Sequence, residues 1–264
     1  MKTLLVKHKH LLICLLGLLL LFAVTGCSKG KNSLLASLGF SAKTLGSAES
    51  LAMKGLDHFE HGKYYKALKS FETLLSSYPF SDYSLLAELK TADSNYYLKN
   101  YEEAVLQYLD FEEHHPTNEA IPYVMFQIGM CYYEQIDTID RDVANAVNAI
   151  NAFSKLLRAF PDSPYQDETE TRIKAATNFL AYHEYFVASF YERTGAYEEA
   201  EARLEYLLKQ YPESVVAPTA EMLLSDIRNG NPPGRNMFGW LPKKHPDWEK
   251  LTPQESESES ESEE

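Results

Sequence analysis

Four segments of the chain repeat one pattern of apolar positions. Each has an alanine, a large apolar residue four positions later, and a proline further along that directly follows an aromatic residue or a histidine. A spacing of four places two side chains on one face of a helix, and proline stops a helix. The pattern therefore predicts four helical segments that share one design. The alanines are Ala67, Ala104, Ala149 and Ala200; the large residues are Phe71, Tyr108, Phe153 and Leu204; the prolines are Pro79, Pro116, Pro161 and Pro212.

A second helix is predicted before each of these segments. Gly62, Asn100 and Gly195 stand where a first helix would end in a left-handed residue before the chain turns back. Small residues in the preceding helices would let two helices approach closely: Gly55, Ala92, Gly129 and Ala188. The combination of small residue, alanine, large apolar residue and proline resembles the tetratricopeptide repeat.

We therefore expect an all-α solenoid of tetratricopeptide-like helix hairpins, with about four and a half repeats over residues 47–230. The third repeat carries an insertion near residues 135–143, and the fourth begins with a long helix near residues 165–193. The second is a poor match, with Glu88, Thr91 and Asn95 at expected apolar positions. A last helix, over about residues 217–229, ends at Gly230.

The first residues are typical of a secretory signal. A basic start is followed by an almost wholly apolar run from Leu11 to Val24, which is short for a spanning helix. Residues 24–27 then resemble a lipobox ending at Cys27, so we expect cleavage after residue 26 and lipidation of Cys27, with palmitate among its acyl chains. The alternative is an ordinary signal peptide with a chance cysteine. Ser28, rather than an aspartate, predicts sorting to the outer membrane, on its periplasmic face.

The remaining chain divides by composition. Residues 27–46 are rich in Ser, Gly and Lys and are interpreted as a tether, and the solenoid follows over residues 47–230. Residues 231–252 form a Pro-containing extension with both tryptophans, Trp240 and Trp248. Residues 253–264 form an acidic Glu/Ser tail that is predicted to be disordered. The extension either folds back onto the solenoid or docks on a partner.

Charge and chemistry narrow the function. The formal net charge is −13, which opposes binding to nucleic acid or to an anionic lipid surface. We found no catalytic constellation, phosphate loop or metal-ligand set, so an enzyme is not expected, and neither is a cofactor or a metal. Cys131 lies in an apolar helical pattern and is expected to be core.

Aromatic residues in the first helices suggest a peptide groove. Tyrosine supplies apolar area together with a hydroxyl, which suits the recognition of extended chains. If the small residue marks the repeat register, the concave-facing positions are Phe59, Tyr96, Tyr97, Tyr123, Phe126, Tyr133, Tyr182 and Tyr185. The alternative is that most of these side chains fill the hairpin cores.

Several short sequence segments resemble those of one family of outer-membrane protein assembly lipoproteins, known as BamD, ComL or YfiO. The resemblance covers about residues 27–230. It includes the insertion in the third repeat and the long first helix of the fourth repeat. The segments lie at residues 77–83, 123–129, 140–142, 160–165, 182–188, 193–197 and 203–206.

The resemblance implies a lipid-anchored subunit of the machinery that inserts β-barrel proteins. Its C-terminal repeats would contact the periplasmic repeats of the barrel-forming subunit, and its N-terminal repeats would meet unfolded outer-membrane protein substrates. Arg203 and Glu205 are the candidate interface residues, although Arg203 could instead pair with a neighbouring acid. The alternative function is another tetratricopeptide envelope lipoprotein, such as a secretin pilotin or a cell-envelope division coordinator.

Overall fold

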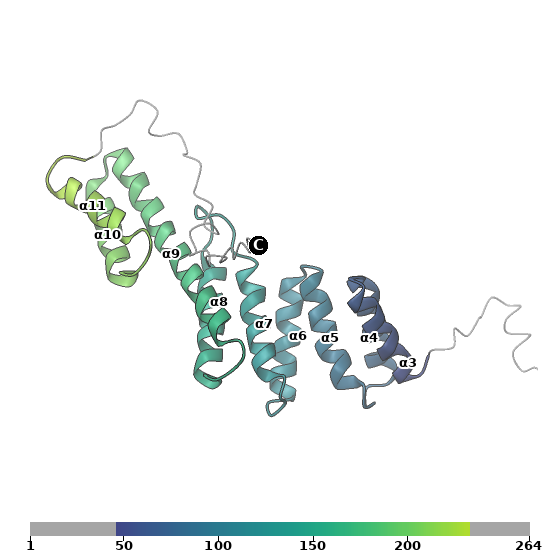
Figure 1. The fold of residues 1–264 in the computed structure, drawn as a ribbon. Helices are drawn as coiled ribbons and strands as arrows, with labels where there is room; N and C mark the ends of the chain where they lie inside the picture. Colours follow the sequence, from purple (N-terminus) through teal and green to yellow (C-terminus); the bar gives the residue numbers. More distant parts are fainter. Residues whose placement is uncertain (1–45, 233–264) are drawn as a thin grey trace, which may run out of the picture. The chain divides into compact units, whose positions relative to one another are not determined.

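The computed structural model describes residues 46–232, and every regular element in that range is a helix (Figure 1). The signal, Cys27, the tryptophan-containing extension and the acidic tail all lie outside the described residues. None of the described helices is long and apolar enough to cross a membrane. The helices are α3 (Ala48–Glu60), α4 (Tyr64–Ser77), α5 (Ser84–Tyr97), α6 (Tyr101–His114), α7 (Ile121–Tyr133), α8 (Ala144–Ala159), α9 (Gln166–Thr194), α10 (Tyr197–Gln210) and α11 (Ala217–Arg228).

The helices pack in chain order as a row of hairpins (Figure 1). Each one contacts the helix before it and the helix after it, and α5 and α9 also touch the first helix of the preceding hairpin. The hairpins are α3/α4, α5/α6, α7/α8 and α9/α10, and α11 follows as a single helix. Contacts that join only neighbouring repeats are the defining feature of a helical solenoid. The predicted all-α tetratricopeptide-like fold is confirmed.

The repeated alanines and large residues form the centre of each hairpin, as the sequence pattern predicted. All four alanines and all four large side chains are fully buried. In two hairpins the first helix carries glycine at the crossing point. A Cβ built on Gly55 would lie 2.5 Å from the Phe71 ring, and one on Gly129 would lie 2.3 Å from the Phe153 ring. The large ring therefore occupies the space that a side chain on the first helix would need.

The turns that follow α3, α5, α9 and α11 share one geometry. Gly62, Gly195 and Gly230 have positive φ angles, and the backbone N–H of the next residue bonds back to a carbonyl five positions earlier. The prediction for Asn100 was wrong, because the left-handed residue of the second hairpin is Lys99, at φ 62°. Asn100 instead takes the N-cap position of α6, and its side-chain amide donates to Asn95 Oδ1 over 3.1 Å.

The turns between hairpins are also alike. Each second helix ends two residues before its proline, as the stop signal predicted. Two residues after each proline, a backbone N–H bonds back to the carbonyl of the residue before that proline, over 3.0–3.2 Å. The donors are Ser81, Asn118, Ser163 and Ser214. The same hydrogen-bonded turn thus precedes α5, α7, α9 and α11.

The insertion and the long helix predicted in the second half are both present. Residues 134–143 connect α7 to α8 without regular structure, and Ile139 of this loop is buried against Phe179 and Leu180 of α9. His183 Nδ1 donates to the Ile139 carbonyl over 2.6 Å. The loop therefore fixes α9 near its midpoint, in a cluster that also includes Ala146 of α8.

Candidate peptide surface and partner interface

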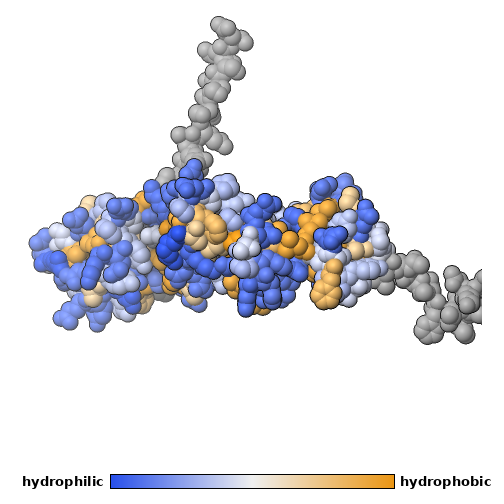
Figure 2. Space-filling model, turned by 90° about the horizontal axis from the view of Figure 1, so that it is seen from below, coloured by the Kyte–Doolittle hydropathy of each residue, from blue (hydrophilic) through white to orange (hydrophobic). Residues whose placement is uncertain are grey.

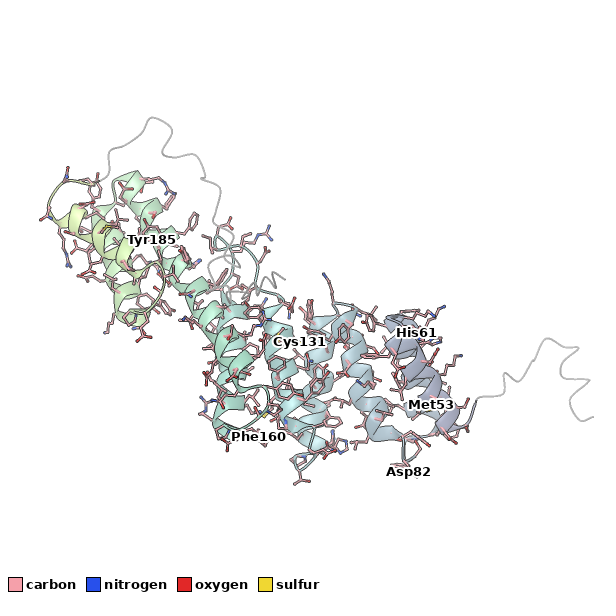
Figure 3. The ribbon with its side chains drawn as sticks, in the orientation of Figure 1. Met53, His61, Asp82, Cys131, Phe160 and Tyr185 are labelled. Atoms are coloured by element: carbon pink, nitrogen blue, oxygen red, sulfur yellow. The ribbon has the colours of Figure 1, made fainter. Side chains whose placement is uncertain are left out.

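The first group of predicted groove residues lies at the tips of the first two hairpins. Phe59 lies in the last turn of α3, and Tyr96 and Tyr97 are the last two residues of α5. Tyr64 and Tyr101, which begin the following helices, complete the group. We call these five residues the tip cluster. In Figure 3, the labelled His61 marks the same end of α3.

Edge and stacked contacts hold the tip cluster together. The Tyr64 and Tyr97 rings stack with their centroids 4.6 Å apart, and Phe59 meets both of them edge-on at 5.3 and 5.6 Å. Tyr96 contacts Tyr97 at 5.4 Å and Tyr101 at 5.6 Å. Tyr97 is 47% exposed, so the cluster presents a rigid aromatic face to solvent.

A buried ionic network lies next to this cluster. Lys90 Nζ sits 4.5 Å from the Phe59 ring centroid and 2.7 Å from Asp93 Oδ2. The Asp93 side chain is 0% exposed. Its other oxygen accepts hydrogen bonds from the Tyr108 hydroxyl at 2.6 Å and from the Tyr123 hydroxyl at 2.9 Å. Asp93 therefore joins α5 to α6 within its own hairpin and to α7 of the next.

Burial, and secondly the Asp93 carboxylate, raise the pKa of the Tyr108 and Tyr123 hydroxyls. Both hydroxyls remain donors to the carboxylate at neutral pH. Of the predicted groove residues, Tyr123 thus has its hydroxyl committed to an internal bond, and only its ring is left for a ligand.

The sequence pattern did not identify Lys90 and Asp93 as interacting residues, although the polar residues around them were a signal. The polar residues Thr91 and Asn95 made the second repeat look degenerate, yet both are buried. Thr91 donates to the Ala87 carbonyl over 2.7 Å, and Asn95 donates to Gln107 over 3.0 Å. A run of polar residues in an otherwise regular repeat indicated a hydrogen-bonded interior rather than a failed helix.

The second group centres on Tyr165, which precedes α9. Its ring stacks on Phe126 at 5.0 Å and lies 6.1 Å from Tyr123. Tyr133 belongs to the core of the third hairpin, because it is only 8% exposed and its ring centroid is 6.5 Å from that of Phe153. The Arg172 guanidinium lies over the Tyr133 ring, 4.9 Å from its centroid.

The third group, Tyr182 and Tyr185, lies on α9, and Figure 3 labels Tyr185 there. Both rings pack against the core that α9 shares with α10 and α11. Burial raises the pKa of the Tyr182 hydroxyl. The eight predicted residues thus fall into separate groups, each made within one or two hairpins, and the tip cluster is the group with a largely exposed member.

A groove lies on the opposite side of α5 from Lys90, Asp93 and Tyr97. Its volume is about 580 Å³, and it lies between α4, α5 and α6. Its rim includes Phe80, which is fully exposed, and Leu85, which is 38% exposed. Seen from below, toward the turns between hairpins, the described surface shows separate hydrophobic patches among hydrophilic side chains (Figure 2).

Both candidate partner-interface residues take part in internal ion pairs. Arg203 Nη1 donates to Glu184 Oε2 over 3.0 Å, which joins α10 to α9. Glu205 pairs with Arg228 of α11, and Arg228 also donates to Glu201 over 2.6 Å. Arg203 thus forms the internal pair that was the alternative in the sequence analysis. Such pairs at the surface are weak, so a partner carboxylate could compete for Arg203.

Within the described residues, no group of three or more His, Cys, Asp or Glu side chains could hold a metal ion. His115 Nε2 lies 2.7 Å from Glu88 Oε2, and His61 lies 3.5 Å from Asp57. Cys131 is buried, as its apolar surroundings predicted, and burial raises the pKa of its thiol to about 12. A thiol in this state is a poor nucleophile.

The chain is similar in sequence to known outer membrane protein assembly factors. The chain is 26% identical over 215 residues to an outer membrane protein assembly factor BamD of Pasteurella multocida, covering 78% of this chain and 79% of the relative. A BamD of Vibrio cholerae is 30% identical over 168 residues, covering 60% and 70%. A BamD of Haemophilus influenzae is 26% identical over 201 residues, covering 72% and 73%.

A solved tetratricopeptide repeat protein from Parabacteroides merdae aligns with a TM-score of 0.36 and 17% identity, covering 69% of this chain and 60% of that one. The family model named YfiO, described as outer membrane lipoprotein, matches residues 46–228, which include every described helix. This protein therefore belongs to the YfiO family of outer membrane lipoproteins.

Proposed function

We propose that this protein is a lipid-anchored, periplasmic scaffold for the assembly of β-barrel proteins in the outer membrane. The observation that carries the proposal is the family match over residues 46–228, together with relatives named as outer membrane protein assembly factors. In this role the solenoid binds and orients other proteins and catalyses no reaction. Its partners would be the barrel-forming subunit and unfolded substrate chains.

Recovery of partners from solubilised membranes tests the assignment. Purification of the full lipoprotein should bring down an outer-membrane barrel protein that has periplasmic repeat domains. Recovery of a secretin would instead support a pilotin, and recovery of a peptidoglycan synthase would support a division coordinator. Either result would replace the proposed function.

Anchoring through Cys27 is part of the proposal. The apolar run that ends at Val24 and the small residues before Cys27 support cleavage and lipidation. A Cys27→Ala variant should incorporate no palmitate and should leave the membrane fraction. Labelling equal to that of the unmodified chain would contradict the assignment of Cys27.

The tip cluster is the surface that we assign to substrate peptides. It offers aromatic rings already held in place by their neighbours, so little side-chain entropy is lost when an extended apolar chain binds. Tyr97 carries most of this surface because it is the exposed member. Lys90, which lies over Phe59, places a positive charge beside the aromatic face.

A Tyr97→Ala variant should reduce cross-linking to a peptide from the last strand of an outer-membrane barrel protein several-fold, with helix content unchanged. Tyr206 on α10 is a matched control, since it is 46% exposed and lies on another hairpin. Loss of cross-linking in a Leu85→Ala variant, with Tyr97→Ala unaffected, would move the peptide site to the groove on the other side of α5.

For the barrel-forming subunit, we keep Arg203 and Glu205 as the candidate contacts. An Arg203→Glu variant places two carboxylates side by side at Glu184, so thermal stability must be measured together with binding. Reduced co-purification with an unchanged melting temperature supports an interface. If both fall together, Arg203 has only a structural role. Arg141→Glu, another exposed arginine in a single ion pair, is the control.

A further inference from the structure

The last described helix, α11, is a first helix without a visible partner. In the hairpins α3/α4, α5/α6 and α9/α10 the second helix runs back along the first and covers one of its faces. Within the described residues, which end at Pro232, nothing runs back along α11 in this way.

The turn after α11 is the same as the turns within the first, second and fourth hairpins. At Gly230, φ is 68°; the Gly230 N–H bonds to the Ile227 carbonyl over 3.1 Å, and the Asn231 N–H bonds to the Asp226 carbonyl over 2.9 Å. Gly62 has the same φ of 68°, and the matching bonds from Gly62 and Lys63 measure 2.9 and 2.8 Å. In that hairpin this turn sends the chain back along the helix it has just left.

The next position supports the same path. In the first hairpin, Phe59 stands three residues before the left-handed Gly62 and packs on Tyr64, two residues after it, with ring centroids 5.3 Å apart. Tyr96 and Tyr101 stand in the same positions around the left-handed Lys99 of the second hairpin. The equivalent residues after α11 are Ile227 and Pro232. Proline is well suited to this place, because it is the first position of the returning segment and proline is favoured there.

The face of α11 that the returning chain would meet is apolar; Leu223 on it is only 8% exposed and packs in the core shared with α9 and α10, whereas Met222 is open to solvent. Leu223 stands seven residues before the left-handed residue, where Gly55, Ala92 and Ala188 stand in the other hairpins. Beside it, Met222 is 62% exposed, and Ile227 is half-buried.

The sequence after Pro232 complements this face. In the first and fourth hairpins, the residue nine positions after the left-handed glycine is large: Phe71 in one and Leu204 in the other. This side chain packs against the small residue of the first helix, as Phe71 does at Gly55. After Gly230 that position is Gly239, between Phe238 and Trp240. The sizes of the two residues are therefore exchanged. Leu223 stands at the position of the small residue, and Gly239 stands at the position of the large one.

We propose that residues 236–241 return along α11 and cover the exposed Met222 beside the buried Leu223, with Phe238 and Trp240 as the covering side chains. The occupant is this chain's own segment because the turn directs it there and only a few residues separate it from Pro232. Closing so short a loop costs little entropy compared with recruiting a separate molecule. The segment thus forms the second half of the fifth repeat, although it has no alanine at the position equivalent to Ala67.

Disulfide trapping in the full-length lipoprotein tests the contact. A Met222→Cys, Phe238→Cys double variant should form an intramolecular disulfide upon mild oxidation, because the two Cα atoms must approach within about 7 Å. The control pairs Phe238→Cys with Met53→Cys on α3, where Met53 is 60% exposed. No disulfide in the first pair, equal disulfide in both, or a cross-linked dimer in place of the intramolecular bond would each overturn the proposal.

Tryptophan fluorescence gives a second, independent measurement. Residues 46–232 contain no tryptophan, so emission reports on Trp240 and Trp248 alone. In a Trp248→Phe background, Trp240 should emit at shorter wavelength than in the denatured protein and resist quenching by iodide. Met222→Asp should remove both properties with helix content unchanged, whereas Met53→Asp should leave them intact. A solvent-like spectrum in the unmodified chain would disprove the packing.

Discussion

The second and third hairpins have the same backbone design but different interiors. In α7/α8 the crossing point is apolar, with the Phe153 ring filling the space above Gly129. In α5/α6 the equivalent large residue is Tyr108, and its hydroxyl reaches the fully buried Asp93. Four successive residues of α5 from Ala92 to Asn95 are buried, and three of them are polar.

The comparison teaches that the repeat fixes shape and leaves the chemistry open. A buried polar side chain is tolerated when it finds a partner, and Asp93 has three, from Lys90, Tyr108 and Tyr123. An apolar centre depends on the fit of its volumes, whereas a polar centre depends on every bond being made. The two hairpins should therefore respond to different substitutions.

The largest effect is expected from Asp93→Ala. This change leaves Lys90 without its carboxylate and removes the acceptor of two buried hydroxyls, and breaking a buried pair costs about 3–5 kcal/mol. Urea unfolding of the full chain, followed by circular dichroism, measures the loss. Asp110→Ala on the exposed side of α6 is the control and should change stability by less than about 0.5 kcal/mol. Equal losses in the two variants would mean that the network contributes nothing.

A smaller loss is expected when the apolar hairpin is overpacked. In Gly129→Ala the new Cβ meets the Phe153 ring at a distance that requires movement, which costs about 1–3 kcal/mol. The cost should shrink in a Phe153→Leu background, because the fourth hairpin already combines Ala188 with Leu204, both fully buried. A double-mutant cycle measures this coupling. Additive losses would show that the two positions do not share one space.

The smallest change at neutral pH is expected from Tyr108→Phe, which removes one hydrogen bond to Asp93 and costs about 0.5–1.5 kcal/mol, because Lys90 and Tyr123 still bind the carboxylate. Its distinctive effect appears at alkaline pH. Because burial raises the folded pKa of Tyr108, the unfolded chain releases that proton first, and stability falls as pH rises above about 10.

Unfolding free energies measured from pH 8 to 11 test this dependence. The slope in the alkaline range should be shallower for Tyr108→Phe than for the unmodified chain. Tyr65→Phe, at a tyrosine that is 62% exposed, should leave the slope unchanged. Equal slopes in all three proteins would exclude Tyr108 as a source of the pH dependence.

Local chemistry made much of the fold predictable. Pro79 and its equivalents end a helix wherever they stand, and the spacing of Ala67 and Phe71 fixes which face of α4 is buried. The insertion and the long α9 followed from where those signals were absent. The one local error, at Asn100, arose because asparagine suits both the left-handed position and the N-cap, and its bond to Asn95 favoured the cap.

Only the tertiary structure decided which side chains meet. Asp93 contacts Tyr123 across two helices, and Arg203 reaches Glu184 on the preceding one, so neither pair is visible in any local pattern. The predicted groove residues separated into groups for the same reason, since each ring packs within its own hairpin or on a neighbouring one. The sequence by itself determined the repeats, because turns and close crossings need particular residues at fixed spacings. The fate of the polar and aromatic residues between them depended on partners far along the chain.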